Sequence, residues 1–361
     1  MRRLPFRYLE PTFCAGLLDD PLLYLNVRPL GRAILFDCGQ LHHLAKRVLK
    51  SLDAVFVTHA HMDHFMGFDT LVRHIHVSPR TVELFGPPGI ARKVAAKLAG
   101  YDWNLTEPTW CSFLVHEVHP EEIRSFIFPG AEGFPCRSAG GRPRNGREIW
   151  RNGFLTVEAD LCDHKIPALV FRITERPTFW IDEGKVAAAG LRKGDWLREM
   201  KRRFYRGELD GAPLTVLRQR EERVEEEEVH DVSGLFEGIR RVQKPASIGY
   251  LTDIGMGEEN LSRVRALLDG VTLLICECSF LAEDMAKART SHHLCTTDVN
   301  GLVEELRPAF LLPMHLSKSY NRKCPQLYQE LALPPAVRLL RLPAHLTPCP
   351  LLPAEFPRLG D

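Results

Sequence analysis

The stretch Thr58-His59-Ala60-His61-Met62-Asp63-His64 directly follows Asp53-Ala54-Val55-Phe56-Val57, a largely apolar run that predicts a buried strand. Four side chains that can bind a metal ion thus fall within six residues. A turn after a strand can direct the first two histidines to one ion and the aspartate and last histidine to a second, because paired ions lie only about 3.5–4 Å apart. Imidazole and carboxylate ligands together favour zinc. The alternative is a solvated histidine-rich loop.

Three further candidate ligands stand where other predicted strands meet loops. His164 precedes an apolar run, whereas Asp253 and His315 each end one. Taken singly, such histidines are more often surface or capping residues, and such an aspartate is more often a turn residue. Together with the first four side chains, they complete a ligand set for a pair of metal ions.

Strand and helix patterns alternate along most of the chain, which indicates an α/β fold. Apolar runs predict strands at Leu22–Val27, Ala33–Phe36, Val82–Gly86, Ser247–Leu251, Val271–Cys276 and Phe310–Met314. Helical spacing predicts helices at Leu41–Leu49, Ile90–Leu98, Glu258–Leu268 and Thr297–Leu306.

Two segments depart from this alternation. Residues 137–151 are rich in Gly, Pro and Arg and predict a mobile basic loop. Residues 176–246 hold a basic stretch and then a run of glutamates, and we interpret them as an insertion, a substrate arm or a lid, within a single domain of residues 1–361. The alternative is a solvated helix pair packed on the body, with glutamates pairing some of the cations. The candidate phosphate-binding cations of the insertion are Arg192, Lys193, Lys201, Arg202 and Arg203.

The composition is that of an ordinary globular protein. The chain has 361 residues, 45% of them hydrophobic, and a formal net charge of +1, so no global field recruits nucleic acid or a membrane. The start of the chain predicts no secretory segment, and the longest apolar runs fall far short of the roughly 20 residues of a membrane helix. Ten irregularly spaced cysteines favour reduced thiols. We therefore expect a soluble, cytoplasmic protein.

The ligand motif, followed by Phe65-Met66-Gly67, resembles the metallo-β-lactamase superfamily, and three more segments resemble one of its members, ribonuclease Z, the tRNA 3′-processing endonuclease. The segment Asp163-His164-Lys165-Ile166-Pro167 is similar to its D-H-x-x-P element. The segments Glu277-Cys278-Ser279-Phe280-Leu281 and His315-Leu316-Ser317-Lys318-Ser319-Tyr320 are similar to E-A-T-F-L and H-F-S-x-R-Y. The resemblance covers approximately Leu22 to Tyr320.

This resemblance implies a metallo-β-lactamase-type αβ/βα four-layer sandwich, with the basic insertion in the position of the family's substrate arm. It implies a zinc-dependent hydrolase that cleaves phosphodiester bonds of pre-tRNA with a metal-bound hydroxide, and homodimers are common in the family. Manganese or iron are the alternative metals. A hydrolase of a small phosphodiester or other ester is the alternative function, and a non-catalytic, metal-stabilised RNA-binding protein is a third.

The resemblance also implies a role for each site residue. The family's second catalytic histidine falls at His293, or at His292 because the doublet leaves the register open, and its suggested role is to protonate the leaving oxygen. Asp63 is expected to orient the attacking water as well as to bind metal. By the same resemblance, His59, His61 and His164 hold one zinc ion, Asp63, His64 and His315 hold the other, and Asp253 bridges the two.

Overall fold

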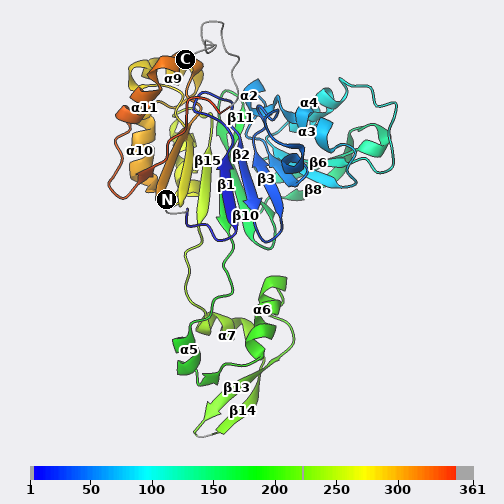
Figure 1. Cartoon of the computed structure of the whole chain (residues 1–361), viewed down its shortest axis with the longest axis vertical. Helices are drawn as coiled ribbons and strands as arrows, with labels where there is room; N and C mark the ends of the chain where they lie inside the picture. The colour runs from blue at the N-terminus through cyan, green and yellow to red at the C-terminus, as the bar shows by residue number, and fades with distance from the viewer. Residues whose placement is uncertain (1–3, 222, 347–361) are drawn as a thin grey trace, which may run out of the picture. The chain divides into compact units, whose positions relative to one another are not determined.

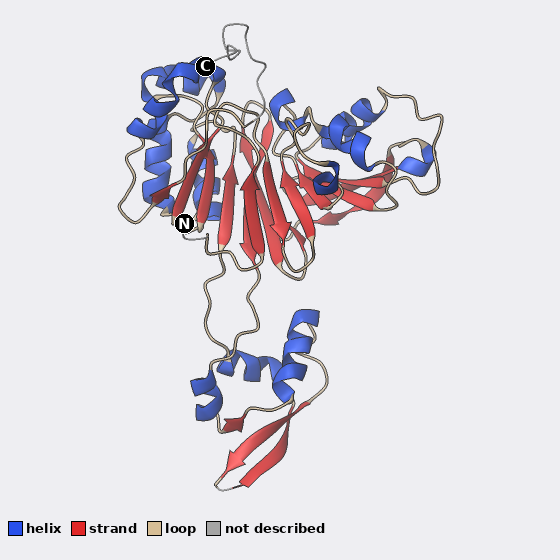
Figure 2. Ribbon diagram, in the orientation of Figure 1, coloured by secondary structure: helices blue, strands red, loops and turns tan. Residues whose placement is uncertain are grey.

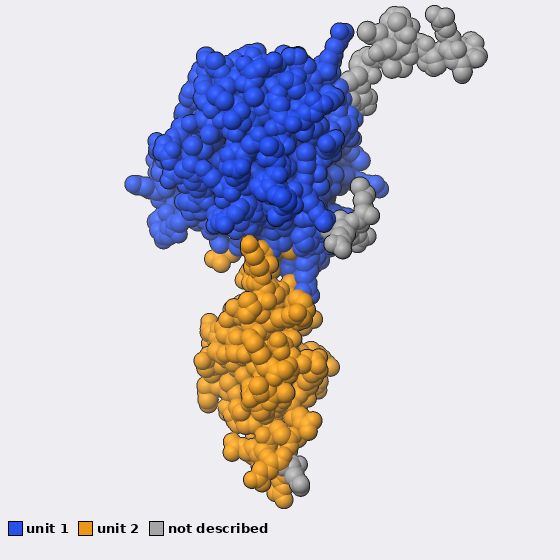
Figure 3. Space-filling view, turned by 90° about the vertical axis from the view of Figure 1, so that its left-hand side faces the viewer, with its two compact units in different colours: residues 1–150, 156–174, 246–361 blue, residues 151–155, 175–245 orange. Residues whose placement is uncertain are grey.

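The computed structural model describes residues 4–221 and 223–346. The chain forms two compact units, which are drawn in different colours in Figure 3. The larger unit comprises residues 1–150, 156–174 and 246–361, and the smaller unit comprises residues 151–155 and 175–245.

The first sheet of the larger unit contains strands β1 to β8, each beside the next in sequence. Strands β3 to β6 run parallel, and the strands on either side of them pair antiparallel. The strands span Leu9–Phe13 (β1), Leu23–Val27 (β2), Arg32–Phe36 (β3), Leu52–Phe56 (β4), Thr81–Gly86 (β5), Ser112–Val118 (β6), Glu122–Pro129 (β7) and Arg137–Pro143 (β8).

The second sheet of the larger unit has the strand order β18-β17-β16-β15-β11-β10-β9. Strands β15 to β18 are parallel to one another, and β11 pairs antiparallel with β15. The strands span Glu148–Arg151 (β9), Leu155–Asp163 (β10), Pro167–Glu175 (β11), Ser247–Leu251 (β15), Leu273–Glu277 (β16), Phe310–Met314 (β17) and Arg338–Leu339 (β18).

Helices cover the outer face of each sheet, as Figures 1 and 2 show. The helices against the first sheet share one apolar core with it, and those against the second sheet share another. The first set is α1 (Lys46–Leu49), α2 (Met62–Phe65), α3 (Phe68–Ile75) and α4 (Ile90–Leu98). The second set is α8 (Glu258–Leu268), α9 (Met285–Ser291), α10 (Thr296–Leu306) and α11 (Cys324–Glu330). Short 3-10 helices lie at Gly130–Glu132 (η1), Ala282–Asp284 (η2) and Lys318–Lys323 (η3).

Aromatic rings fill the space between the two sheets. Phe36 and Phe56 of the first sheet stack with their centroids 4.8 Å apart, and Phe171 of the second sheet meets both rings edge-on. Tyr250, also from the second sheet, lies 5.7 Å from Phe36. Each buried aromatic ring removes a large apolar area from water, so this layer holds the sheets together. The predicted four-layer αβ/βα sandwich is thereby confirmed.

Two local predictions were wrong. Residues 137–151 are not a mobile loop, because they contain β8 and β9, the edge strands of the two sheets. Every side chain of β8 is exposed, so the strand lacks the apolar alternation that would reveal it and is held by backbone pairing with β7. Helix α1 begins at Lys46 instead of Leu41, and before it the Nε2 atom of His43 binds the Cys14 carbonyl at 2.9 Å.

The smaller unit has a core of its own, in which Trp196, Met200 and Phe236 are buried. Three strands form its sheet, in the order β12-β13-β14. These are Leu191–Arg192 (β12), Leu214–Arg220 (β13) and Arg223–Val229 (β14), with helices α5 (Glu183–Ala188), α6 (Trp196–Arg206) and α7 (Val232–Ile239). Across the described residues of both units, no helix is long and apolar enough to cross a membrane.

Candidate metal centre

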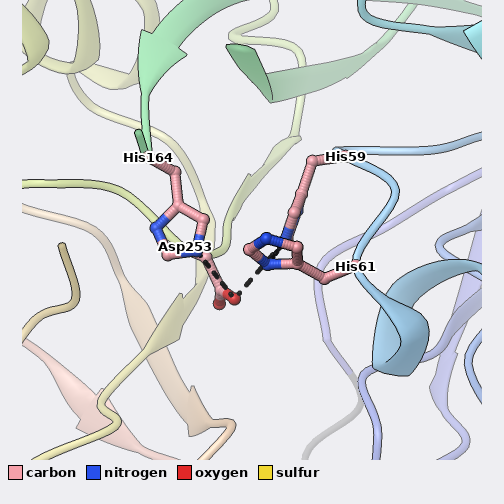
Figure 4. Close-up of side chains that lie close together, drawn as sticks. All are labelled: His59, His61, His164 and Asp253. Carbon is pink, nitrogen blue, oxygen red and sulfur yellow. Dashed lines mark hydrogen bonds and ion pairs between the residues drawn. The ribbon is translucent and has the colours of Figure 1, made fainter. Parts of the chain in front are cut away.

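Loops at the ends of strands β4, β10, β15 and β17 bring the predicted ligands of the larger unit together. His59, His61 and His164 surround the carboxylate of Asp253, and Figure 4 shows their rings directed toward it. The Nε2 atoms of His59 and His164 lie 3.6 and 3.7 Å from Asp253 Oδ2, and His59 Nε2 lies 3.0 Å from His61 Nδ1. One potential ligand atom from each residue lies within 4.8 Å of the others, which suits a single ion.

A second group shares Asp253 with the first. It contains Asp63, His64 and His315, and its potential ligand atoms are also within 4.8 Å of one another. His64 Nε2 lies 3.3 Å from Asp253 Oδ2, and His315 Nε2 lies 3.1 Å from Asp63 Oδ2. Because Asp253 belongs to both groups, its carboxylate stands in the position of a bridging ligand.

The donor atoms fit divalent cations. Among the described residues, His64 Nε2 and Asp253 Oδ1 are buried side-chain atoms without a hydrogen-bond partner. Buried polar atoms are normally satisfied, but His64 Nε2 meets Asp253 Oδ2 at 3.3 Å and Asp253 Oδ1 meets His315 Nδ1 at 3.1 Å without forming a hydrogen bond. A cation between them would satisfy both. The set of imidazoles and carboxylates is also one that divalent transition metals bind.

Close backbone contacts position the loop that carries the motif. A Cβ atom on Gly39 would lie only 2.0 Å from the Asp63 carbonyl oxygen, so only glycine fits there. On the same turn, the Cys38 amide donates to the His64 carbonyl at 2.9 Å, and the Gly67 amide donates to the Cys38 carbonyl at 2.7 Å. The turn after β3 therefore fixes the direction of both Asp63 and His64.

Asp37 orients His64 from beneath the site. Its fully buried carboxylate lies 2.9 Å from His64 Nδ1, and it accepts hydrogen bonds from the Thr58 amide and from the Tyr250 hydroxyl. A carboxylate on one ring nitrogen fixes the tautomer and leaves the other nitrogen free to bind metal. Asp253, the neighbouring carboxylate, acts with Asp37 to raise the pKa of His64 well above its ordinary value, although burial opposes this shift.

The buried charges shift other pKa values in opposite directions. Burial, together with the positive charge of His64, lowers the pKa of His59 well below its ordinary value. Burial would also lower the pKa of His315, but the Asp253 carboxylate outweighs it and raises that pKa to about 10. Burial would raise the pKa of Asp63, but the hydrogen bond from His315 lowers it below its usual range. Asp63 thus stays ionised and His59 neutral, which are the states that bind metal, whereas His64 and His315 carry a proton that a bound metal ion would displace.

Several residues at the site adopt a backbone conformation that only glycine takes up easily. Asp37, Lys165, His292 and His315 have φ angles between 57° and 60°, in the left-handed region. Such strain costs free energy and persists only where the surrounding structure enforces it. Its concentration around the ligands indicates that the fold holds these side chains in place.

The two adjacent histidines of the sequence have different surroundings. His292 turns its ring to Asp163, with Nδ1 3.0 Å from Oδ2, and its backbone carbonyl lies 2.7 Å from His164 Nδ1. His292 therefore positions the predicted ligand His164 through its backbone. His293 lies beside the ligands, with Nδ1 3.8 Å from Asp253 Oδ1.

Glu277 holds His293 in this position. Its carboxylate has no exposed surface and lies 3.0 Å from His293 Nδ1. Burial lowers the pKa of His293, but the hydrogen bond and the charge of Glu277 outweigh burial and raise it above its ordinary value. Sequence reasoning assigned no role to Glu277 or to Asp37. One feature of the sequence could have revealed them: each is an acidic residue within or directly after an apolar strand. A charge in such a place is rare unless it has a partner.

The candidate cations of the insertion lie in the smaller unit, and most of them have partners there. Lys193 pairs with Glu183 at 2.6 Å, and Arg202 pairs with Glu199. The remaining three differ in how many hydrogen-bond partners their side chains have. Arg192 Nε donates to Gln219, Arg203 is occupied by Glu199 and two carbonyls, and exposed Lys201 has no side-chain partner within the described residues.

Comparisons with known proteins agree with this geometry. Residues 32–160 match the Beta-lactamase superfamily domain. The ribonuclease Z of Deinococcus radiodurans is 30% identical over 292 residues, which are 80% of this chain and 83% of that protein. Among solved structures, the metallo-β-lactamase fold protein YhfI of Bacillus subtilis superposes with a TM-score of 0.51 at 14% identity, covering 92% of this chain and 98% of that one. The long-form RNase Z of yeast superposes with a TM-score of 0.53 at 12% identity, covering 94% and 41%. The structural likenesses establish the metallo-β-lactamase fold.

Proposed function

The chain belongs to the ribonuclease Z family and is a metal-dependent hydrolase, and from this we propose that it is an endoribonuclease that removes 3′ trailers from pre-tRNA. The observation that carries the proposal is the pair of ligand groups joined by Asp253. Relatives named ribonuclease Z align with most of this chain. A site for two neighbouring ions suits displacement at phosphorus, because attacking and leaving oxygens can be stabilised together.

We assign His59, His61 and His164 to one ion, Asp63, His64 and His315 to the other, and Asp253 to both. Zinc is the proposed metal, since imidazole nitrogens with carboxylate oxygens are the ligands of hydrolytic zinc sites. When bound, two such ions would supply an activated water and neutralise charge on the reacting phosphate.

The chain's own side chains have two further roles in this proposal. Asp63 is more than a third exposed and ionised, so its second oxygen can accept a hydrogen bond from the attacking water and orient it. His293 lines the cavity next to the ligands, and Glu277 occupies its Nδ1 atom. Its Nε2 atom is therefore the ring nitrogen available to donate a proton to the leaving oxygen.

The smaller unit is the proposed RNA arm, with Arg192, Lys193, Lys201, Arg202 and Arg203 as phosphate contacts. Support comes from the exposure of most of these side chains and from a folded core that presents them on fixed elements. Lys201 is the best-supported phosphate contact of the five. Arg203 is the least supported, because Glu199 and backbone carbonyls already occupy its guanidinium.

We also propose that the protein forms homodimers and resides in the cytoplasm. The described cysteines are all free, as a reducing compartment requires.

The test is cleavage of a pre-tRNA with a 3′ trailer, run beside hydrolysis of bis(p-nitrophenyl) phosphate. Purified protein of measured metal content is compared with a His64→Ala variant, which removes a ligand. We expect a single cut near the end of the acceptor stem, absent in the variant. Hydrolysis of the small ester without RNA cleavage would overturn the RNA assignment and leave a small-molecule hydrolase.

The arm is tested by a Lys193→Ala, Lys201→Ala, Arg202→Ala triple variant. Loss of phosphate contacts weakens RNA binding and flattens its salt dependence by about one unit of slope per contact. We expect KM for RNA to rise about tenfold or more, by this electrostatic loss. The matched control is Lys93→Ala, an exposed lysine on α4 of the larger unit. An equal rise in KM for RNA in the two variants would refute the assignment of the smaller unit as an RNA arm.

A further inference from the structure

A cavity of about 320 Å³ opens beside the metal ligands. Its lining includes Asp63, His293 and His315, which belong to the site described above. The lining also includes Asp20, Ser317 and Lys318, to which the reaction assigns no role. The volume exceeds what a single phosphate fills, so the cavity has room for a neighbouring part of a substrate chain.

The acidic residues of the cavity wall are aspartates. Asp19 and Asp20 both line it, and both are largely buried. The oxygens of Asp19 bind elsewhere: Oδ2 accepts from the Gly16 and Leu346 amides, and Oδ1 lies 2.7 Å from His345 Nδ1. Among the described residues that line the cavity, Lys318 is the one lysine or arginine.

Lys318 is held loosely by Asp20. The Nζ atom lies 3.2 Å from Asp20 Oδ1, but the lysine side chain is 71% exposed whereas the carboxylate is 5% exposed. A salt bridge with so exposed a partner contributes little, because water competes for the ammonium. Because an ammonium group has three donors, Lys318 can contact a phosphate while it keeps the Asp20 carboxylate. The buried carboxylate, in turn, keeps the cation at the cavity when no substrate is present.

We propose that Lys318 is a substrate-binding residue that contacts an RNA phosphate adjacent to the scissile one, and that Asp20 holds its ammonium ready for that contact. Lys318 follows the ligand His315 by three residues and lines the same cavity. A scissile phosphate at the ligands therefore places the next phosphate of the chain within reach of this side chain. The proposal rests on the proposed function and adds a residue that favours polynucleotide over a one-phosphate ester.

The test compares Lys318→Ala with Lys318→Arg on pre-tRNA and on bis(p-nitrophenyl) phosphate. The alanine variant should raise KM for RNA about tenfold while kcat changes less than threefold. Its kcat/KM should therefore fall about tenfold more on RNA than on the small ester. Arginine should restore most of the affinity, because it keeps the charge. The matched control is Lys323→Ala, which removes a half-exposed lysine of the same 3-10 helix that pairs with Glu283 and does not line the cavity.

A second measurement is independent of tRNA cleavage. Short oligouridylates are tested as inhibitors of small-ester hydrolysis, with uridine monophosphate as the one-phosphate reference. In the wild type, the added phosphate should tighten inhibition several-fold, and Lys318→Ala should abolish this gain. Failure of pre-tRNA cleavage with this gain intact would overturn the proposed substrate and leave the Lys318 contact standing. Equal losses on both substrates, or an unchanged inhibition pattern, would overturn the contact.

Discussion

Glu277 Oε2 lies 3.0 Å from His293 Nδ1, although Glu277 has no exposed surface of its own. The same carboxylate accepts hydrogen bonds from the Ile254 amide and from the Ser279 hydroxyl. These contacts satisfy both of its oxygens and fix the orientation of the His293 ring. A buried carboxylate so arranged sets both the position and the protonation of its histidine.

Replacing Glu277 with Gln should lower kcat for RNA about 10- to 100-fold, a size typical for loss of such a supporting contact. The carboxylate raises the pKa of His293 against the effect of burial, so its loss should move the alkaline limb of the pH–rate profile to lower pH. Single-turnover rates across the titration range of histidine measure both effects. Glu283→Gln, an exposed glutamate paired with Lys323, is the control. An unmoved alkaline limb would contradict the assignment of His293.

An Asp37→Asn variant should bind its metal about 10- to 100-fold more weakly, because the carboxylate no longer fixes the His64 ring. Asparagine tolerates the left-handed backbone of this position, so the fold should survive. Metal affinity is measured by competition with a chelating dye. Asp53→Asn, which removes a half-exposed pair with Arg32, should have no such effect. Equal affinities of the two variants would argue against the role of Asp37.

Removal of metal by a chelator should abolish hydrolysis and lower the melting temperature. The buried atoms His64 Nε2 and Asp253 Oδ1 have no hydrogen-bond partner, and a bound metal ion would supply one. Metal at about 100 times its Kd adds ~2.7 kcal/mol to stability, so the Tm should fall by roughly 4 °C. Calorimetry before and after chelation measures the change, and separate additions of zinc, manganese and iron show which metal restores activity. An unchanged Tm would mean that these atoms are not ligands.

An Asp298→Asn variant should destabilise the protein by about 1 kcal/mol at neutral pH. Asp298 accepts from the Cys295 amide at the start of α10 and pairs with Arg289, contacts that resemble a helix cap. Burial would raise its pKa, but the hydrogen bond from Arg289 lowers it below the ordinary value. The stabilisation by ionised Asp298 is therefore present above its unfolded-state pKa of about 3.9. It is lost as the pH falls through the lower pKa of Asp298 in the folded protein. Urea unfolding of both proteins at several pH values should show the difference shrinking under acid conditions.

The strands and helices of the body were predictable from local patterns. Helices α4, α8 and strand β17 have the predicted bounds, because their apolar spacing matches the period of the element. Strand β8 was not predictable in this way. Its side chains carry no apolar alternation, and its place in the sheet depends on pairing with the neighbouring strand β7.

The sequence by itself determined the metal-binding chemistry, because the ligand types cluster in one motif and at the ends of apolar strands. It also contained the family resemblance that ordered those ligands. Only the tertiary structure separated the surroundings of His293 from those of His292, since Glu277 is 16 residues from His293 in the chain but 3.0 Å away in space. It likewise placed Asp37 beneath His64 and Asp20 beside Lys318. These partners act through distances across the fold, and no local period of the sequence records such distances.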